Sequence, residues 1–262
     1  MQVKANGITF NYRVEGSRGA PWVMLSNSLA TDLSMWDAQA AALAESFQVL
    51  RYDQRGHGRT EAPAGRYTFD LLIQDAVALM DALTIPRANF LGLSMGGVTG
   101  MGLAQRHGDR LDRVVICDAP CASTPATAAQ WEERIVIAQK DGMEPLVEVT
   151  VGRWFPPEVV KANPPYLDLV REMIRTTPVN GFVGCAAALA DHDLRSGAGT
   201  VKKPVLFIVG EKDGTTPAIM RQMHQAVAGS QFVELPVAGH ISNLDQPEMF
   251  TRSVRDFLMA AA

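Results

Sequence analysis

The segment around Ser94 constrains the fold more than any other part of the chain. Gly92-Leu93-Ser94-Met95-Gly96 fits the pattern G-x-S-x-G, between an apolar run at 89–93 and a stretch with helical spacing at 97–107. A strand that turns this sharply into a helix brings the chain so close to itself that side chains at the flanking glycines would clash. The serine then projects from the sheet at a helix N-terminus, where the helix dipole favours a developing negative charge. We therefore predict a nucleophilic serine at position 94.

The rest of the chain alternates between short apolar runs and helical segments. Continuously apolar runs are typical of parallel strands that are buried on both faces, and they lie at 22–25, 47–50, 89–93, 114–117, 205–209 and 232–235. Helical spacing occurs at 69–83, 97–107 and 217–227. At the start of the chain, 3–5 and 8–14 flank Asn6-Gly7, a strong hairpin signal. The sequence of 262 residues, 47% of them hydrophobic, thus predicts an α/β fold with a mostly parallel central sheet flanked by helices.

One stretch interrupts this alternation. Between about residues 121 and 199 no run is typical of a buried strand, whereas helical patterns and prolines are frequent, as in Pro156-Pro157 and Pro164-Pro165. We expect a helical insertion that lies over the carboxyl ends of the strands. In this interpretation 1–120 and 200–262 form the α/β core, and 121–199 forms a helical cap.

A serine hydroxyl needs a base to accept its proton. In a fold of this kind the chain order is serine, acid, histidine, which leaves His192, His224 and His240. His240 follows the last predicted strand and is our candidate for the base. Asp213 follows the run 205–209 and is the favoured acid, and Asp118, which follows the run 114–117, is the alternative.

The negative oxygen of a tetrahedral intermediate needs two preorganised N–H donors. One is expected from Met95, the residue after the nucleophile. The other is expected from the loop after the run 22–25, where the amide of Leu29 is the candidate.

Composition excludes several other classes. The formal net charge of −4 gives no basic footprint for nucleic acid. No run of about 18 apolar residues predicts a membrane span, and the first residues lack the apolar core of a signal peptide. Cys117, Cys121 and Cys185 follow no metal-ligand spacing and are expected to be buried free thiols in the cytoplasm. The segment Asp53-Gln54-Arg55-Gly56-His57-Gly58 is interpreted as a structural turn, and no metal or organic cofactor is expected.

Taken together, these motifs resemble the α/β-hydrolase superfamily over nearly the whole chain, and within it the 3-oxoadipate enol-lactonases of the β-ketoadipate pathway. The loop Leu25-Ser26-Asn27-Ser28-Leu29-Ala30-Thr31-Asp32 is similar to the oxyanion loop of that family, although most superfamily members carry His-Gly where this chain has Asn27-Ser28. Pieces of the predicted cap are similar as well, namely Trp131-Glu132-Glu133-Arg134-Ile135, Arg153-Trp154-Phe155 and Cys185-Ala186-Ala187-Ala188-Leu189.

The resemblance implies a small anionic lactone as the substrate, opened by water, and no nucleic-acid or membrane partner. It implies substrate contacts at Asn27 and Ser28. Because Trp131 and Arg134 are spaced i, i+3, they share a helix face, so Arg134 is the candidate for the substrate carboxylate, with Trp131 as a wall of the site. Trp154 is a second wall candidate.

Several alternatives stay open. Arg134 can instead be a solvated side chain paired with Glu133. The same triad serves carboxylesterases, perhydrolase-like enzymes and C–C bond hydrolases, which differ in the cap. A ligand receptor on the same fold is less favoured, because serine, acid and histidine are all present in the expected order.

Overall fold

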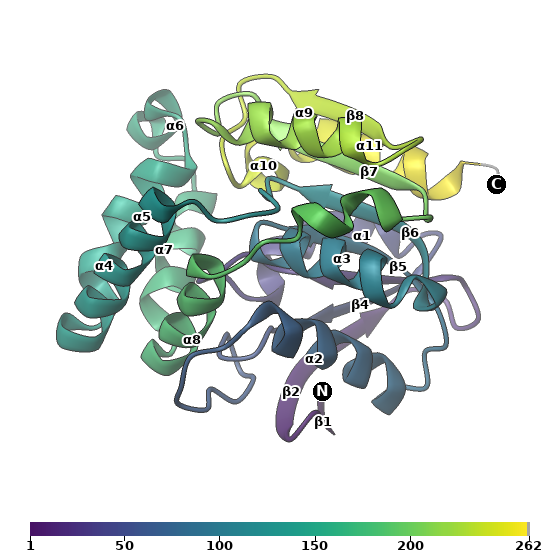
Figure 1. The fold of residues 1–262 in the computed structure, drawn as a ribbon, viewed down its shortest axis with the longest axis horizontal. Helices are drawn as coiled ribbons and strands as arrows, with labels where there is room; N and C mark the ends of the chain where they lie inside the picture. The colour runs from purple at the N-terminus through teal and green to yellow at the C-terminus, as the bar shows by residue number, and fades with distance from the viewer. Residues whose placement is uncertain (261–262) are drawn as a thin grey trace.

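A single eight-stranded sheet runs through the computed structural model, which describes residues 1–260 (Figure 1). The strands lie in the order β1-β2-β4-β3-β5-β6-β7-β8. The strand β2 is antiparallel to both of its neighbours, and all pairings from β4 to β8 are parallel. The strands are β1 (Gln2–Ala5), β2 (Ile8–Glu15), β3 (Trp22–Ser26), β4 (Gln48–Tyr52), β5 (Ala88–Leu93), β6 (Leu111–Cys117), β7 (Val205–Gly210) and β8 (Gln231–Leu235). The predicted strands and the mostly parallel sheet are confirmed.

Helices cover both faces of the sheet (Figure 1). Helices α1 (Asp37–Leu43) and α11 (Pro247–Met259) pack together on one face, and α2 (Phe69–Ala82), α3 (Met95–Arg106) and α9 (Thr216–Ala226) lie on the other. The three predicted helices are confirmed, but α3 begins two residues before the predicted start at 97. Gly96 of the motif and the following Gly97 therefore lie within its first turn. None of the helices between residues 1 and 260 is long and apolar enough to cross a membrane.

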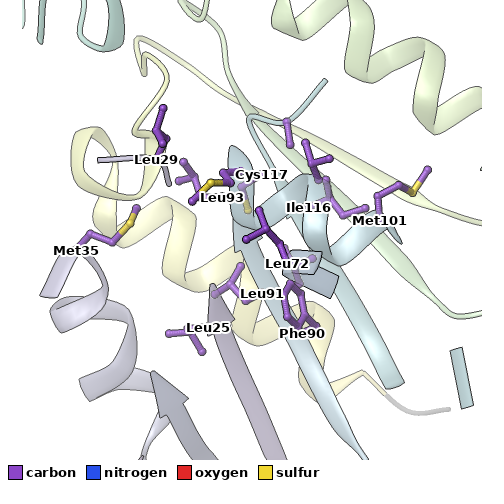
Figure 2. Packing of buried hydrophobic residues seen from close by; sticks show 14 of the residues in the cluster. Leu25, Leu29, Met35, Leu72, Phe90, Leu91, Leu93, Met101, Ile116 and Cys117 are labelled. Carbon is purple, nitrogen blue, oxygen red and sulfur yellow. The ribbon is translucent and has the colours of Figure 1, made fainter. Parts of the chain in front are cut away.

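The core lies between β5, its neighbouring strands and the helices packed on them. Figure 2 shows Phe90 of β5 and Ile116 of β6 with Leu72 of α2 and Met101 of α3, whereas Leu91, the next residue of β5, points to the opposite face of the sheet. All residues of β5 are buried, which explains why the run is apolar throughout. Each fully buried side chain of this size contributes about 1.5–3 kcal/mol, so this strand holds the serine turn on a rigid support. All three cysteines are buried and free, as predicted.

Five α-helices fill the chain between β6 and β7, where the sequence predicts a helical insertion. They lie beside one another at one end of the sheet, at the left of Figure 1. An isolated bridge between Ala122 and Asp193 joins the two connections through which this segment leaves and rejoins the sheet. The helices are α4 (Pro125–Asp141), α5 (Val147–Trp154), α6 (Pro157–Ala162), α7 (Tyr166–Thr176) and α8 (Val179–Ala190). Two of these helices, α4 and α5, face the carboxyl ends of β5 and β8, because their side chains line a cavity with Ser94 and His240, which follow those strands.

Candidate active site

Ser94 lies in a strained turn between β5 and α3. Its backbone has φ 55° and ψ −116°, a conformation that non-glycine residues rarely adopt and that is common at functional sites. Its N–H donates to the carbonyl of Cys117 at 2.8 Å. A Cβ at Gly92 would overlap the carbonyl of Gly96, and a Cβ at Gly96 would overlap the carbonyl of Ser26. The glycines therefore allow the turn that presents the serine at the N-terminus of α3.

His240 and Asp213 lie beside this serine. His240 Nε2 is 2.9 Å from Ser94 Oγ, and His240 Nδ1 is 2.8 Å from Asp213 Oδ2. Because a carboxylate only accepts hydrogen bonds, Nδ1 carries the proton and Nε2 is left to accept from the serine hydroxyl. The side chains of His240 and Asp213 expose 13% and 11% of their surface, so a small molecule can reach the histidine.

The other two histidines that follow Ser94 in the chain contact different groups. The ring nitrogens of His192 lie 2.9 Å from the carbonyl of Leu189 and 3.1 Å from that of Pro120. His224 Nδ1 is 2.7 Å from the hydroxyl of Ser230. Of the three candidates, the structure places His240 next to the serine.

Asp118, the alternative acid, has other partners. It accepts hydrogen bonds from the Gly210 N–H at 2.8 Å and from the Ser242 hydroxyl at 2.5 Å. Burial raises the pKa of Asp118, and the negative charge of Asp213 raises it further. Asp118 thus ties the end of β7 to the short helix α10 (Ser242–Asp245), and Asp213 is the carboxylate in contact with His240.

The loop that carries His240 is held by contacts with the segment α4–α8 and with Asp245 of α10. The His240 N–H donates to the carbonyl of Trp154 at 2.7 Å, and the two rings stack with centroids 6.1 Å apart and planes at 28°. Asp245 accepts from the Gly239 N–H at 2.7 Å and from the Tyr166 hydroxyl at 2.9 Å. Helices α5 and α7 therefore contact the loop that carries the histidine.

The loop after β3 faces the serine from the other side. Leu29 lines the cavity beside Ser94, and Met95 is the first residue of α3. Ala30, next to Leu29, has φ 56°, and its N–H donates to His57 Nε2 at 2.9 Å. His57 Nδ1 donates to the carbonyl of Arg55 at 3.1 Å. Burial lowers the pKa of His57 to about 4, so its ring stays a neutral acceptor near pH 7 and holds this loop in place.

The sequence did not predict the bond between the Ala30 N–H and His57. The segment 53–58 is interpreted there as a structural turn only, and no local pattern links its histidine to a loop 27 residues earlier.

Asn27 and Ser28 are placed differently from each other. The side-chain amide of Asn27 donates to the carbonyls of Thr31 at 2.6 Å and Ser28 at 3.0 Å, and its carbonyl oxygen accepts from the Gln54 N–H at 3.3 Å. Asn27 does not line the cavity, so the expected substrate contact at this residue has no support in the geometry. Ser28 does line the cavity, and its buried hydroxyl has no hydrogen-bond partner within residues 1–260.

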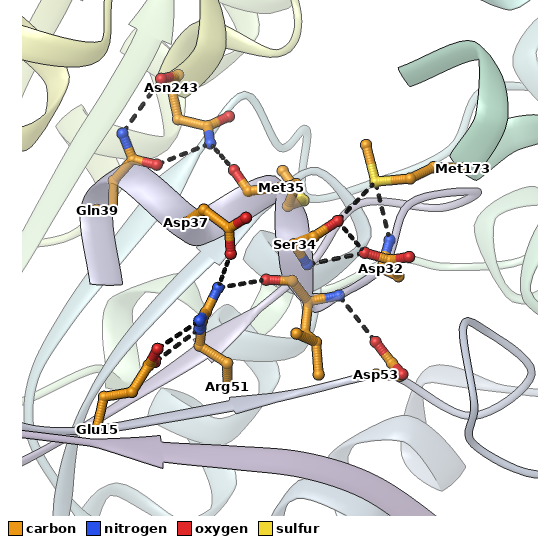
Figure 3. Close-up of polar contacts among 11 residues, drawn as sticks. Glu15, Asp32, Ser34, Met35, Asp37, Gln39, Arg51, Asp53, Met173 and Asn243 are labelled. Carbon is orange, nitrogen blue, oxygen red and sulfur yellow. Dashed lines mark hydrogen bonds and ion pairs between the residues drawn. The ribbon is translucent and has the colours of Figure 1, made fainter. Parts of the chain in front are cut away.

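Polar contacts also fix the segment that follows this loop (Figure 3). Asp53 accepts from the Leu33 N–H at 2.8 Å, and the buried Arg51 donates to the Leu33 carbonyl at 3.1 Å. Arg51 also pairs with the carboxylates of Glu15 and Asp37. These contacts, together with the bond from the Ala30 N–H to His57, anchor the loop that carries Leu29.

A small cavity connects these groups to the segment α4–α8. It has a volume of about 130 Å³, below the range of about 300–1,000 Å³ that is typical of sites for drug-sized ligands. Ser94 and His240 line it from the sheet, and Trp131, Arg153 and Trp154 line it from α4 and α5. Both predicted tryptophan walls therefore reach the cavity.

Arg134 is not among the described residues that line this cavity. Its guanidinium carbon lies 4.8 Å from the ring centroid of Trp131, so the two share a helix face as the spacing predicts. Burial lowers the pKa of Arg134 to about 10, and the positive charge of Arg153 lowers it further, while Glu133 opposes both. Arg153, which the sequence did not single out for this role, is the arginine at the cavity. Helical spacing alone cannot show which of two arginines in neighbouring helices faces the serine.

Within residues 1–260, no three histidine, cysteine, aspartate or glutamate side chains form a group that could hold a metal ion.

Comparison with known proteins agrees with this geometry. Residues 17–252 match the model of the alpha/beta hydrolase family. The chain is 34% identical to 3-oxoadipate enol-lactonase 2 of Acinetobacter baylyi over 95% of this chain and 93% of that protein, and 32% identical to enol-lactonase 1 of the same organism over 98% and 96%. The crystal structure of the enol-lactonase from Burkholderia xenovorans LB400 is 44% identical and superposes with a TM-score of 0.95, covering 99% of this chain and 100% of that one.

The predicted resemblance to 3-oxoadipate enol-lactonases is thereby confirmed. The predicted class of carboxylic ester hydrolase is supported by the same relatives. The chain belongs to the alpha/beta hydrolase family.

Proposed function

We propose that this protein hydrolyses 3-oxoadipate enol-lactone to 3-oxoadipate with Ser94, His240 and Asp213 as its catalytic triad. The observation that carries the proposal is the continuous chain of contacts from Asp213 Oδ2 through the imidazole to Ser94 Oγ, at 2.8 Å and 2.9 Å. In this scheme the hydroxyl of Ser94 attacks the lactone carbonyl while His240 Nε2 takes its proton. The amides of Leu29 and Met95 bind the negative oxygen of the tetrahedral intermediate.

Collapse of that intermediate breaks the ring C–O bond and leaves an acyl-enzyme. The leaving group is an enolate that remains attached to the acyl chain, and it takes up the proton held by His240. His240 then accepts a proton from water while the water oxygen attacks the acyl carbon, and when the bond to Ser94 breaks, the serine oxygen takes that proton back from His240. One water molecule is consumed for each lactone opened.

Two further observations support a lactone of this size. The cavity of about 130 Å³ suits a small ring, and the enol-lactonase relatives align over nearly the whole chain, the helical segment included. We assign residues 121–199 as a cap that selects the substrate. The three buried free thiols fit a cytoplasmic enzyme of aromatic catabolism.

The deciding experiment compares two substrates, 3-oxoadipate enol-lactone and p-nitrophenyl acetate. We expect a high kcat/KM for the lactone, and loss of activity on both substrates in Ser94→Ala. Ser26→Ala is the matched control, because Ser26 is a buried serine at the end of β3 and its hydroxyl bonds to the hydroxyl of Tyr52 at 2.9 Å. It should keep wild-type kcat on both substrates.

Activity on the acetate ester alone would favour a general carboxylesterase over a lactonase. Failure of a fluorophosphonate to label Ser94 would contradict the serine mechanism itself and favour a ligand receptor on the same fold.

A further inference from the structure

Two arginines of the segment α4–α8 lack the partners that most other arginines of the protein have. The buried Arg51 and Arg55, for example, each pair with carboxylates. Within residues 1–260, neither Arg134 nor Arg153 has an ion pair or a side-chain hydrogen bond. Both lie on Trp131 instead, with guanidinium carbons 4.8 Å and 5.5 Å from its ring centroid.

The electrostatic setting of these two side chains favours a bound anion. Desolvation by the surrounding protein lowers the pKa of each, although Arg153 as a whole is exposed, and for Arg134 repulsion by Arg153 lowers the pKa further. Both guanidinium groups nevertheless stay charged near pH 7, because an arginine is deprotonated only at far higher pH. Two like charges that share one indole therefore repel each other, and a carboxylate placed between them would relieve that repulsion.

Arg153 is the member of the pair that a substrate can reach. It lies in the last turn of α5 and lines the cavity with Ser94 and His240. The attraction of Asp213 acts on Arg153 as well, but that carboxylate is already bonded to His240 at 2.8 Å. The five donors of Arg153 are thus available to a ligand, and a guanidinium binds a carboxylate through two parallel hydrogen bonds.

We propose that Arg153 binds the carboxylate of an acyl chain whose ester carbonyl lies at Ser94. Arg134 contributes to the same subsite through its charge and by packing on Trp131. The enzyme thereby selects esters and lactones that carry a second, free carboxylate on the acyl side. The identity of the natural substrate rests on the proposed function, but the preference for an anionic acyl chain does not.

A competing role for Arg153 is to position Asp213. The two roles differ in their kinetic signature, because a positioning role changes kcat for every ester, whereas a binding role changes KM for anionic esters only.

The test uses a matched pair of chromogenic esters, mono-4-nitrophenyl succinate and 4-nitrophenyl butanoate, which have acyl chains of the same length with and without a carboxylate. 3-Oxoadipate enol-lactone is the third substrate. For Arg153→Ala we expect kcat/KM on the succinate ester and on the lactone to fall about 10- to 100-fold, mainly through KM, as is typical of a lost charged hydrogen bond. Activity on the butanoate ester should stay within about threefold, which also shows that the variant is folded.

Two further variants sharpen the assignment. Arg153→Lys should recover part of the lost activity on the anionic esters, because it keeps the charge but not the paired donors. Arg134→Ala should have the smaller effect of the two alanine variants, about threefold.

An equal loss on the anionic and the neutral ester in Arg153→Ala would overturn the proposal in favour of positioning Asp213. A larger loss in Arg134→Ala than in Arg153→Ala would overturn it in favour of Arg134. If the succinate ester depends on Arg153 but the wild-type enzyme does not open the lactone, the subsite stands and the proposed function fails.

Discussion

The two sides of the active-site cavity differ in whether their polar side chains have hydrogen-bond partners within the protein. On the side of the sheet, loops contribute groups that are bonded to one another. Asp213, for example, accepts a hydrogen bond from His240 Nδ1 at 2.8 Å, and His240 Nε2 lies 2.9 Å from Ser94 Oγ. On the side of α4 and α5, Arg134 and Arg153 have no such partners within the described part of the chain.

This difference indicates that the sheet side serves catalysis and that the side of α4 and α5 serves substrate selection. Catalysis needs donors and acceptors that are already in place when charge develops, and a network of paired groups holds them there. Selection of a substrate needs groups whose bonds are completed only when the substrate binds. Changes on the sheet side should therefore affect all esters equally, and changes on the side of α4 and α5 should distinguish between esters.

The largest effect is expected from the acid that contacts His240. Asp213→Asn removes the acceptor that fixes the proton on Nδ1, and kcat should fall about 10⁴-fold on neutral and anionic esters alike. Steady-state kinetics with the matched pair of nitrophenyl esters would measure it. Asp118→Asn is the control and should keep kcat within about threefold, because Asp118 bonds to Gly210 and Ser242 and not to His240. A reversal of the two results would make Asp118 the acid.

A smaller but still general effect is expected at Gly239. A Cβ at this position would overlap the carbonyl of Trp154, which accepts the His240 N–H. Gly239→Ala should therefore shift the histidine, and a displacement of about 1 Å can cost about 100-fold in rate. The loss should appear in kcat for both nitrophenyl esters. Wild-type kinetics in this variant would show that the loop adapts without moving the ring.

Ser28 offers a sharper test, because it lies on the sheet side yet has an unpartnered hydroxyl. If this hydroxyl adds a third donor to the oxyanion site, Ser28→Ala should lower kcat about 10- to 100-fold on both esters. Ser26→Ala, which removes a hydroxyl bonded to Tyr52, should change the free energy of unfolding and leave kcat intact. A loss confined to the anionic ester would instead make Ser28 part of the selecting side.

The smallest effect concerns stability and pH. The pKa of His57 is lowered from 6.5 to about 4, so the unfolded chain binds a proton between these values and the folded protein does not. The free energy of unfolding should therefore decrease as the pH falls from 6.5 to 4, by about 3 kcal/mol from this residue. His57→Gln should remove that part of the slope in urea unfolding series. An unchanged slope would show that His57 does not stay neutral in the fold.

The sequence predicted the sheet side well because its signals are local. The serine turn needs two glycines at fixed positions, buried strands need apolar runs, and the chain order of the triad follows from the order of the strands. It favoured Asp213 but left Asp118 open as the acid, since both follow strands that prove to be parallel neighbours, with Cys117 opposite Ile208.

The other side depends on contacts that no local pattern records. Trp131 and Arg134 do share a face of α4, as the spacing predicts, but the orientation of that face depends on how α4 packs against the rest of the segment. The arginine that lines the cavity belongs to α5. Likewise, Asn27 and Ser28 are adjacent in the sequence, yet one bonds within its own loop and the other faces the cavity.

The bond between the His240 N–H and the Trp154 carbonyl has a consequence for how such enzymes can diversify. It uses only main-chain atoms, so it places no demand on the kind of side chain at position 154. The geometric demand falls on position 239, where glycine leaves room for the approaching carbonyl. Related enzymes can therefore change the side chains that contact a new substrate while His240 keeps its position beside the serine. The condition is that glycine is retained at position 239.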